Sequence, residues 1–264
     1  MDKRYADVNG ARLAYYEAGS GQPVVLLHGF CGSSAYWDEV VPLLQTELRV
    51  IVPDLRGHGA SSAPDTSSSM EEMAADIAGL LDTLALKQAS VLGHSLGGYI
   101  TLALAEQHAD RLTAFGLVHS TAFPDDEKGK EGRLKGMQTI GEQGLPVFLE
   151  GLIPRLFAPK HVESMPEAVT KARQIGLGTS PGGAIRTLEG MRTRPDRNQV
   201  LSEAKVPVLL VAGEEDQIVA PARTFSASGG HIRQALIAGA GHMSMMEAPR
   251  QLADEILAFF KGQA

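Results

Sequence analysis

The pentapeptide at residues 93–97, Gly-His-Ser-Leu-Gly, is the feature that most restricts how this chain can fold. It follows an apolar run at 89–92 that predicts a strand, and it opens a segment at 96–108 whose pattern predicts a helix. A strand that turns this sharply into a helix leaves no room for side chains beside the turn, so glycine is needed at positions 93 and 97. The turn is therefore expected to hold Ser95 out at the end of the strand.

The same order of strand and helix repeats along much of the chain. Apolar runs predict buried strands at residues 24–27, 50–52, 89–92, 114–118, 206–211 and 234–237. Helical spacing, with a capping box at Ser69 and Glu72, predicts helices at residues 37–48 (about a dozen residues), 69–84, 96–108 and 252–260. Asn9-Gly10 lies between two alternating segments and predicts a hairpin. The pattern indicates an α/β fold, a mostly parallel sheet wrapped by helices.

The alternation stops near Ser120 and resumes near Val206. From residue 121 to about 200 no strand pattern is found, and glycine and proline interrupt short helical stretches. We expect residues 1–120 and 201–264 to form one α/β core, with residues 121–200 inserted as a helical cap.

Length and composition limit where such a chain works and what it binds. The 264 residues suffice for one large core. The single cysteine, Cys31, permits no disulfide within the chain, which fits a reducing compartment. Neither a signal peptide at residues 1–7 nor an apolar run of the ~18 residues that span a membrane is found. With a formal net charge of −7, we expect a cytoplasmic protein without membrane insertion or a nucleic-acid partner. The sequence leaves the oligomeric state open.

Ser95 needs a base, because a serine hydroxyl is a weak nucleophile until its proton is removed. His242, in Gly-Ala-Gly-His at 239–242, follows the last predicted strand, and active sites assemble in loops at the carboxyl ends of parallel strands. We therefore assign the base to His242. Three further histidines end predicted strands, and we expect them to be hydrogen-bonding residues that line the site: His28, His94 and His119.

An acid is required to orient the imidazole of the base. Asp216, in Gly-Glu-Glu-Asp at 213–216, follows the strand at 208–211 and lies between Ser95 and His242 in the chain. We assign the orienting acid to Asp216. The alternatives that the sequence leaves open are Glu214, Glu215, Asp125 and Asp126.

Five motifs in order resemble the α/β-hydrolase superfamily, and within it the branch of small, cap-bearing serine esterases similar to carboxylesterases. They are His-Gly-Phe at 28–30, Asp-Leu-Arg-Gly-His-Gly-Ala-Ser at 54–61, the pentapeptide at 93–97, residues 213–216 and Gly-His at 241–242. The resemblance implies an α/β-hydrolase fold in which the backbone N–H groups of Phe30 and Leu96 form the oxyanion hole. It implies no metal and no organic cofactor, and a structural turn without chemistry at 54–61.

The activity that the resemblance implies is hydrolysis of carboxylic esters. Ser95, His242 and Asp216 would act through an acyl-enzyme on a small-molecule ester, and apolar residues of the cap favour an apolar acyl group. The family's haloalkane dehalogenases and epoxide hydrolases are disfavoured, because they carry aspartate at the position of Ser95. The same motifs occur in lactonases, carbon–carbon bond hydrolases and perhydrolases, and some members of the fold are ligand receptors, so these alternatives stay open.

Cys31 directly follows Phe30 in the proposed oxyanion loop. We expect it to be a small buried residue without a role in chemistry. The alternative is that its side chain borders the acyl entrance.

Overall fold

The apolar runs of the sequence form the centre of an eight-stranded sheet in the computed structural model, which describes residues 2–262. The strand order is β1-β2-β4-β3-β5-β6-β7-β8, with β3 to β8 parallel and β2 antiparallel to both its neighbours. This confirms the predicted α/β fold. The strands are β1 (Lys3–Val8), β2 (Ala11–Ala18), β3 (Gln22–Leu27), β4 (Leu48–Pro53), β5 (Ala89–His94), β6 (Leu112–Val118), β7 (Val208–Gly213) and β8 (Ile232–Ile237).

The predicted N-terminal hairpin is confirmed. β1 and β2 pair from Lys3 with Tyr16 to Val8 with Ala11, so only Asn9 and Gly10 form the turn. Both have positive φ, 47° and 75°, as a tight hairpin turn of this kind requires.

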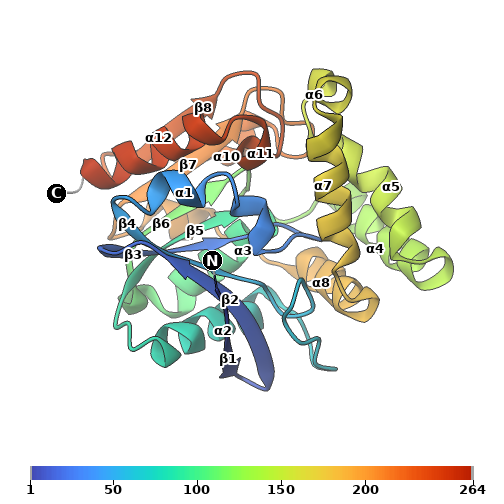
Figure 1. Ribbon diagram of the computed structural model, residues 1–264, viewed down its shortest axis with the longest axis horizontal. Helices are drawn as coiled ribbons and strands as arrows, with labels where there is room; N and C mark the ends of the chain where they lie inside the picture. The colour runs from blue at the N-terminus through green and yellow to red at the C-terminus, as the bar shows by residue number, and fades with distance from the viewer. Residues whose placement is uncertain (1, 263–264) are drawn as a thin grey trace.

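Helices cover both faces of the sheet (Figure 1). α2 and α3 pack together on one face, and α1 and α12 contact each other on the opposite face. The predicted capping box is confirmed at the start of α2, where Ser69 and Glu72 bond reciprocally to each other's backbone N–H groups. The helices of the core are α1 (Val41–Leu44), α2 (Met70–Thr83), α3 (Leu96–Gln107), α10 (Pro221–Thr224), α11 (Ser244–Glu247) and α12 (Pro249–Lys261), with 3₁₀ turns at Ser34–Trp37 and Ala109–Arg111.

The helix predicted for residues 37–48 is wrong. Trp37 ends a 3₁₀ turn, α1 is a single turn at Val41–Leu44, and Leu48 begins β4. The cause is Pro42, which lacks an N–H group and fits only the first turn of a helix, so no helix continues through it from Trp37. The apolar spacing reflects burial by two short turns and a strand.

Residues 121–200, which we call the inserted segment, lie between β6 and β7 in the chain, and no strand occurs in them. Figure 1 shows α4 to α8 gathered at one side of the sheet. The Leu156 carbonyl accepts a hydrogen bond of 2.8 Å from the N–H of His242, which fixes the segment beside the carboxyl end of β8. Its helices are α4 (Glu127–Gln143), α5 (Leu145–Leu156), α6 (Pro159–Ser164), α7 (Pro166–Leu177), α8 (Pro181–Thr193) and α9 (Asn198–Ser202).

The segment at 54–61 is a turn that ties the loops after β3 and β4 together. The buried Asp54 carboxylate accepts the N–H groups of Ser34 at 2.7 Å and Ala60 at 2.8 Å. Gly59 has a φ of 53° and touches the same carboxylate, which leaves no space for a Cβ atom. These contacts explain the motif by structure alone.

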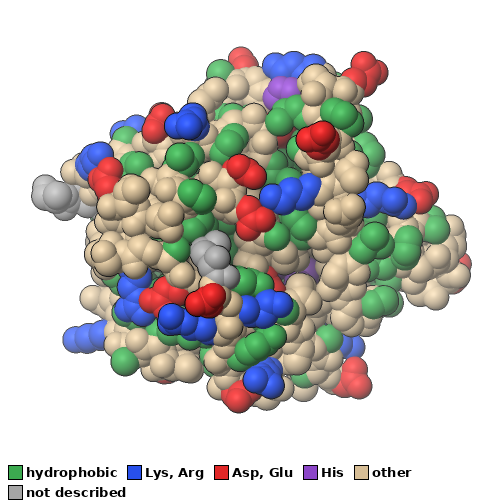
Figure 2. Space-filling view, in the orientation of Figure 1, with side chains coloured by type: hydrophobic (Ala, Val, Ile, Leu, Met, Phe, Trp, Pro, Cys, Tyr) green, Lys and Arg blue, Asp and Glu red, His purple; other side chains and the backbone are tan. Residues whose placement is uncertain are grey.

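The outer surface mixes charges of both signs. On the face shown in Figure 2, basic and acidic side chains are interspersed, as is usual for a solvated surface. Within residues 2–262, no helix combines the length and the apolar character needed to cross a membrane.

Candidate active site

Ser95 lies at the sharp turn between β5 and α3, as predicted. Its φ is 51° and its ψ −111°, a backbone conformation that costs of order 1–3 kcal/mol and is tolerated only where the surroundings enforce it. A Cβ atom at Gly93 would overlap the Gly97 carbonyl, and one at Gly97 would lie 2.7 Å from the Leu27 Cβ. The two glycines therefore let β3, β5 and α3 close around the turn.

Asp216 and His242 come together from the loops after β7 and β8. The Nδ1 atom of His242 lies 2.8 Å from Oδ2 of Asp216, and both side chains are buried. The other oxygen, Oδ1, accepts the N–H groups of Ile218 at 2.8 Å and Val219 at 2.9 Å. These bonds fix the carboxylate in one orientation and leave Nε2 of His242 as its free ring nitrogen.

The ionisation of Asp216 is set by two opposing effects. Burial alone would raise the pKa of its carboxyl, but His242 and His119 lower this pKa well below its usual range. The carboxylate therefore remains charged throughout the neutral range and can stabilise an imidazolium at His242.

The other acids that the sequence left open are engaged elsewhere. Glu214 accepts the N–H of Gly239, and Glu215 pairs with Lys160 at the surface. Asp126 caps α4 by accepting the N–H of Gly129, and Asp125 pairs with two arginines. Of the five candidates, only Asp216 bonds to His242 within residues 2–262.

His119 is a second histidine on the same carboxylate. Its Nδ1 lies 3.3 Å from Oδ2 of Asp216, and its Nε2 lies 2.6 Å from Oγ of Ser244. The sequence predicted only a hydrogen-bonding role at the site; it did not predict the carboxylate as partner. Its position directly after β6, the strand between those that precede Ser95 and Asp216, is the signal that could have revealed this contact.

His119, Asp216 and His242 are close enough to hold a metal ion, because their ligand atoms lie within 4.8 Å of one another. Both histidine Nδ1 atoms already face Oδ2 of Asp216. The arrangement therefore serves hydrogen bonding as it stands, and a metal would have to break these bonds to bind.

The remaining strand-end histidines support the loops around Ser95. Nε2 of His94 lies 2.9 Å from the carbonyl oxygen of His242. His28 donates through Nδ1 to the Gly29 carbonyl at 2.8 Å and accepts the N–H of Leu55 at Nε2, at 2.9 Å. Both are buried, in keeping with the hydrogen-bonding roles expected from the sequence.

Two backbone N–H groups are available beside Ser95. Leu96 is the first residue of α3, where an N–H has no partner within the helix, and Phe30 lies in the loop after β3. Within residues 2–262, no hydrogen-bond acceptor is found for either N–H group. The positive end of the α3 dipole adds to the attraction for a negative oxygen at this point.

Cys31 is fully buried and does not line the cavity at Ser95. Burial also raises the pKa of its thiol. Its position supports the small-buried-residue interpretation and argues against a place at the acyl entrance.

Ser95 and His242 share a cavity of about 50 Å³. The inserted segment contributes part of its wall, and no hydrogen bond joins Ser95 Oγ to His242 in the described part of the chain. The wall residues besides Ser95 and His242 are Phe30, Tyr36, His94, Tyr99, Arg133, Leu152, Leu156, Met191 and Ile218.

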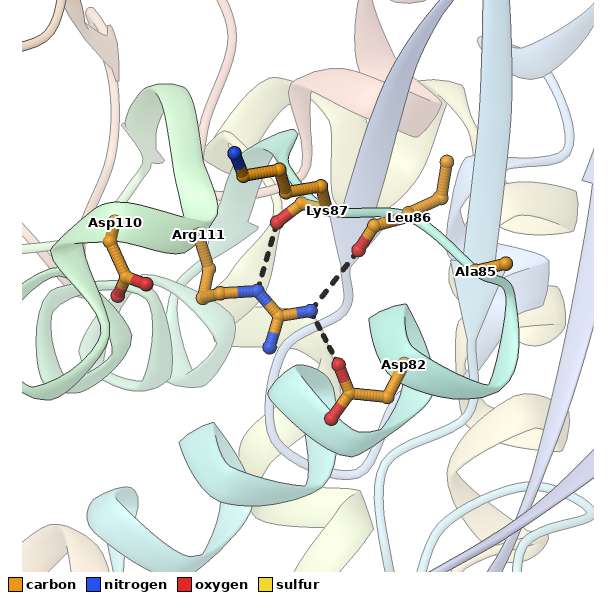
Figure 3. A pocket seen from close by; sticks show the side chains of 6 residues that line it. All are labelled: Asp82, Ala85, Leu86, Lys87, Asp110 and Arg111. Carbon is orange, nitrogen blue, oxygen red and sulfur yellow. Dashed lines mark hydrogen bonds and ion pairs between the residues drawn. The ribbon is translucent and has the colours of Figure 1, made fainter.

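A wider surface hollow of about 380 Å³ lies elsewhere, between the end of α2 and the start of β6 (Figure 3). The guanidinium of Arg111, which lines this hollow, donates to the carbonyls of Leu86 and Lys87 and pairs with Asp82. Neither serine nor histidine lines this hollow, so the candidate chemistry belongs to the smaller cavity.

Glu247 holds the loop of His242, a role that the sequence did not predict. Its buried carboxylate accepts the N–H groups of both neighbours of His242, Gly241 and Met243, each at 3.0 Å to Oε1. The other oxygen accepts the N–H of Ala158 at 2.8 Å and lies 2.7 Å from Nδ1 of His161. One carboxylate therefore joins the histidine loop to the inserted segment.

The fold and the site together define a hydrolase of the α/β type. Residues 22–249 match the model of the alpha/beta hydrolase fold family, and the chain belongs to that family.

Its relatives include esterases, lactonases and an acyltransferase component. A thermophilic esterase from Thermogutta terrifontis, solved with malate bound, is 32% identical, with a TM-score of 0.94 over 99% of each chain. The dihydrolipoyllysine-residue acetyltransferase component of the acetoin cleaving system of Pseudomonas putida is 31% identical over 97% of this chain and 68% of its own length. The 3-oxoadipate enol-lactonase 2 of Acinetobacter baylyi is 27% identical over 91% of this chain and 89% of its own.

The buried histidines beside the Phe30 loop predict a loss of stability in mild acid. Burial lowers the pKa of His28 to about 4, and burial together with His28 lowers that of His58 to about 3. The unfolded chain takes up these protons below pH ~6.5, whereas the folded chain does not until near pH 4 or 3. The stabilisation is thus complete above pH ~6.5 and is lost as pH falls, by about 1.4 kcal/mol per pH unit for each histidine.

Urea unfolding of the His58→Gln variant between pH 7 and pH 4.5 checks this. As the pH falls, its free energy of unfolding should decrease less steeply than that of the wild type. The difference in slope should be about 1.4 kcal/mol per pH unit, the contribution of one histidine. The control is His108→Gln, at a partly exposed position, which should keep the wild-type slope. Equal slopes in all three proteins would contradict the assignment.

Glu247→Gln is predicted to slow catalysis through the position of His242. A glutamine amide keeps one acceptor oxygen but turns the other into a donor, which faces N–H groups. We expect kcat for hydrolysis to fall about tenfold to a hundredfold, because small displacements of a catalytic group cost this much. Glu255→Gln, on α12 at a surface pair with Arg233, is the control and should stay within about twofold of the wild type. Equal kcat values for the two variants would exclude the role of Glu247.

Proposed function

We propose that the chain is a serine hydrolase that cleaves carboxylic ester bonds of small molecules. The observation that carries the proposal is the buried bond of 2.8 Å between His242 Nδ1 and Asp216 Oδ2, with His242 in one cavity with Ser95. A charged acid behind a histidine, beside a serine on a strained turn, is the arrangement that makes a serine hydroxyl nucleophilic.

The proposed reaction begins when Ser95 Oγ attacks the ester carbonyl and Nε2 of His242 accepts its proton. Asp216 stabilises the imidazolium, and the N–H groups of Phe30 and Leu96 bind the negative oxygen of the tetrahedral intermediate. His242 then protonates the leaving alcohol, and an acyl-enzyme remains on Ser95. Water activated by His242 releases the acid and restores the enzyme.

We further propose that residues 121–200 act as a cap on the core formed by residues 1–120 and 201–264. Arg133, Leu152, Leu156 and Met191 of this segment line the cavity, so its sequence selects the substrate. A cavity of about 50 Å³ holds only a few water-sized groups, which favours a short acyl chain. Its leucine, methionine and phenylalanine walls suit apolar carbons.

Lactone hydrolysis is the second candidate, favoured by the likeness to the enol-lactonase of Acinetobacter baylyi. A lactone is an internal ester, so the same residues would act in the same order, and the alcohol would remain part of the product. Rates on short-chain esters, lactones and β-diketones, with a perhydrolysis assay beside them, separate the ester, lactone, carbon–carbon and perhydrolase alternatives.

Ser95→Ala tests the proposal directly. The variant should keep its fold, since alanine is smaller than serine, and should lose kcat on a short-chain ester by at least about 10³-fold. The expected result is this loss of hydrolysis together with an unchanged circular dichroism spectrum. A variant that kept more than a few per cent of the wild-type kcat would show that another group is the nucleophile.

Asp216→Asn should lower kcat by up to ~10⁴-fold, because an amide favours the wrong tautomer of His242. Glu215→Gln is its matched control: it lies one residue away and pairs with Lys160 at the surface, so kcat should change less than about tenfold. A larger loss at position 215 than at 216 in steady-state kinetics would mean that the acid is misassigned.

A further inference from the structure

Arg133 is a charged residue in the cavity of Ser95 that the proposed mechanism does not use. It belongs to α4 of the inserted segment and lines the cavity together with Ser95, His242 and Tyr99. Among the described residues that line this cavity, it is the only one with a permanent charge. A cation beside apolar walls is unfavourable unless something of opposite charge faces it.

The guanidinium of Arg133 is held at one end. Its Nε donates to Oδ2 of Asp125 at 3.0 Å. The other oxygen of Asp125 accepts Nη2 of Arg194 at 2.8 Å, and Arg194 lies over the ring of Tyr99, 3.9 Å from its centre. These contacts fix the orientation of the Arg133 guanidinium.

The charges of this cluster do not balance. Burial opposes ionisation of Asp125, but Arg133 and Arg194 lower its pKa, so it carries one negative charge against two positive ones. Apart from a contact with the hydroxyl of Tyr99, no acceptor is found for the two Nη atoms of Arg133 within residues 2–262. Because one hydroxyl cannot satisfy the four N–H groups of the two Nη atoms, N–H donors and one unbalanced positive charge remain at the cavity.

A simple structural ion pair does not account for this arrangement. Arg194 alone neutralises Asp125, whereas exposed arginines of the inserted segment, such as Arg173 with Glu150, pair one to one at the surface. The paired N–H groups of a guanidinium match the two oxygens of a carboxylate.

We propose that Arg133 forms an anion subsite, and that the substrate is an ester or lactone that also carries a carboxylate. The subsite rests on the proposed function, since it positions the carbonyl of such a molecule at Ser95. The carboxylate would bind the Nη atoms of Arg133, and the short carbon chain between the two groups would lie along the apolar walls.

Half-esters of dicarboxylic acids test this. The wild type should hydrolyse monomethyl succinate with a higher kcat/KM than methyl butyrate or dimethyl succinate, which lack the charge. Arg133→Met should lower the ratio of kcat/KM for monomethyl succinate to that for methyl butyrate about 30-fold to 150-fold, as expected for lost bonds to a charged group. Arg133→Lys should lie between, because lysine keeps the charge without the fork.

Arg173→Met is the matched control, since it removes an exposed arginine of α7 and should change neither substrate. A wild type that does not prefer the half-ester overturns the subsite, as does an equal loss on both esters in Arg133→Met that still folds. If Arg133→Met does not fold, the wild-type preference and the Arg133→Lys variant decide.

The Ser95→Ala variant tests the proposed function separately from the anion subsite. If the wild type cleaves neither ester, succinate binding measured by calorimetry still tests the subsite: binding weakened at least tenfold in Arg133→Met supports it, and equal binding overturns it.

Discussion

The close approach of the backbone at positions 93 and 97 is the constraint on which the rest of the structure depends. Because both residues are glycine, α3 can start directly against the ends of β3 and β5. That contact strains Ser95 and places it at the edge where the parallel strands end. The other groups of the site reach this point from α3, from loops after other strands of the sheet, or from the inserted segment.

Local signals in the sequence predicted the fold well, because each rested on backbone geometry. Asn9-Gly10 requires positive φ, and Ser69 with Glu72 satisfies the first N–H groups of a helix, so both motifs have one structural meaning. The apolar spacing from Trp37 to Leu48 failed because it reports burial and not backbone conformation. Pro42 should have been given more weight than the spacing.

The sequence could predict the site only from the order of strands and loops along the chain. A residue that follows a parallel strand lies at the right edge, which was enough to select Ser95, Asp216 and His242 as candidates. The partners of a side chain depend on packing between distant elements, and no sequence pattern records them. The contacts of His119 with Asp216, of Glu247 with both neighbours of His242, and of Arg133 with Asp125 therefore became visible only in the structure.

The bonds of Glu247 bear on how this enzyme could evolve or be redesigned. The N–H of Ala158 and the loop of His242 share one acceptor, the Glu247 carboxylate. The part of the inserted segment around Ala158 therefore cannot shift without displacing the histidine. Variation in substrate choice is thus easier in α4, which carries Arg133, than near Ala158. A segment transplanted from a relative would have to bring a matching residue at position 247, although that residue lies far outside the transplanted sequence.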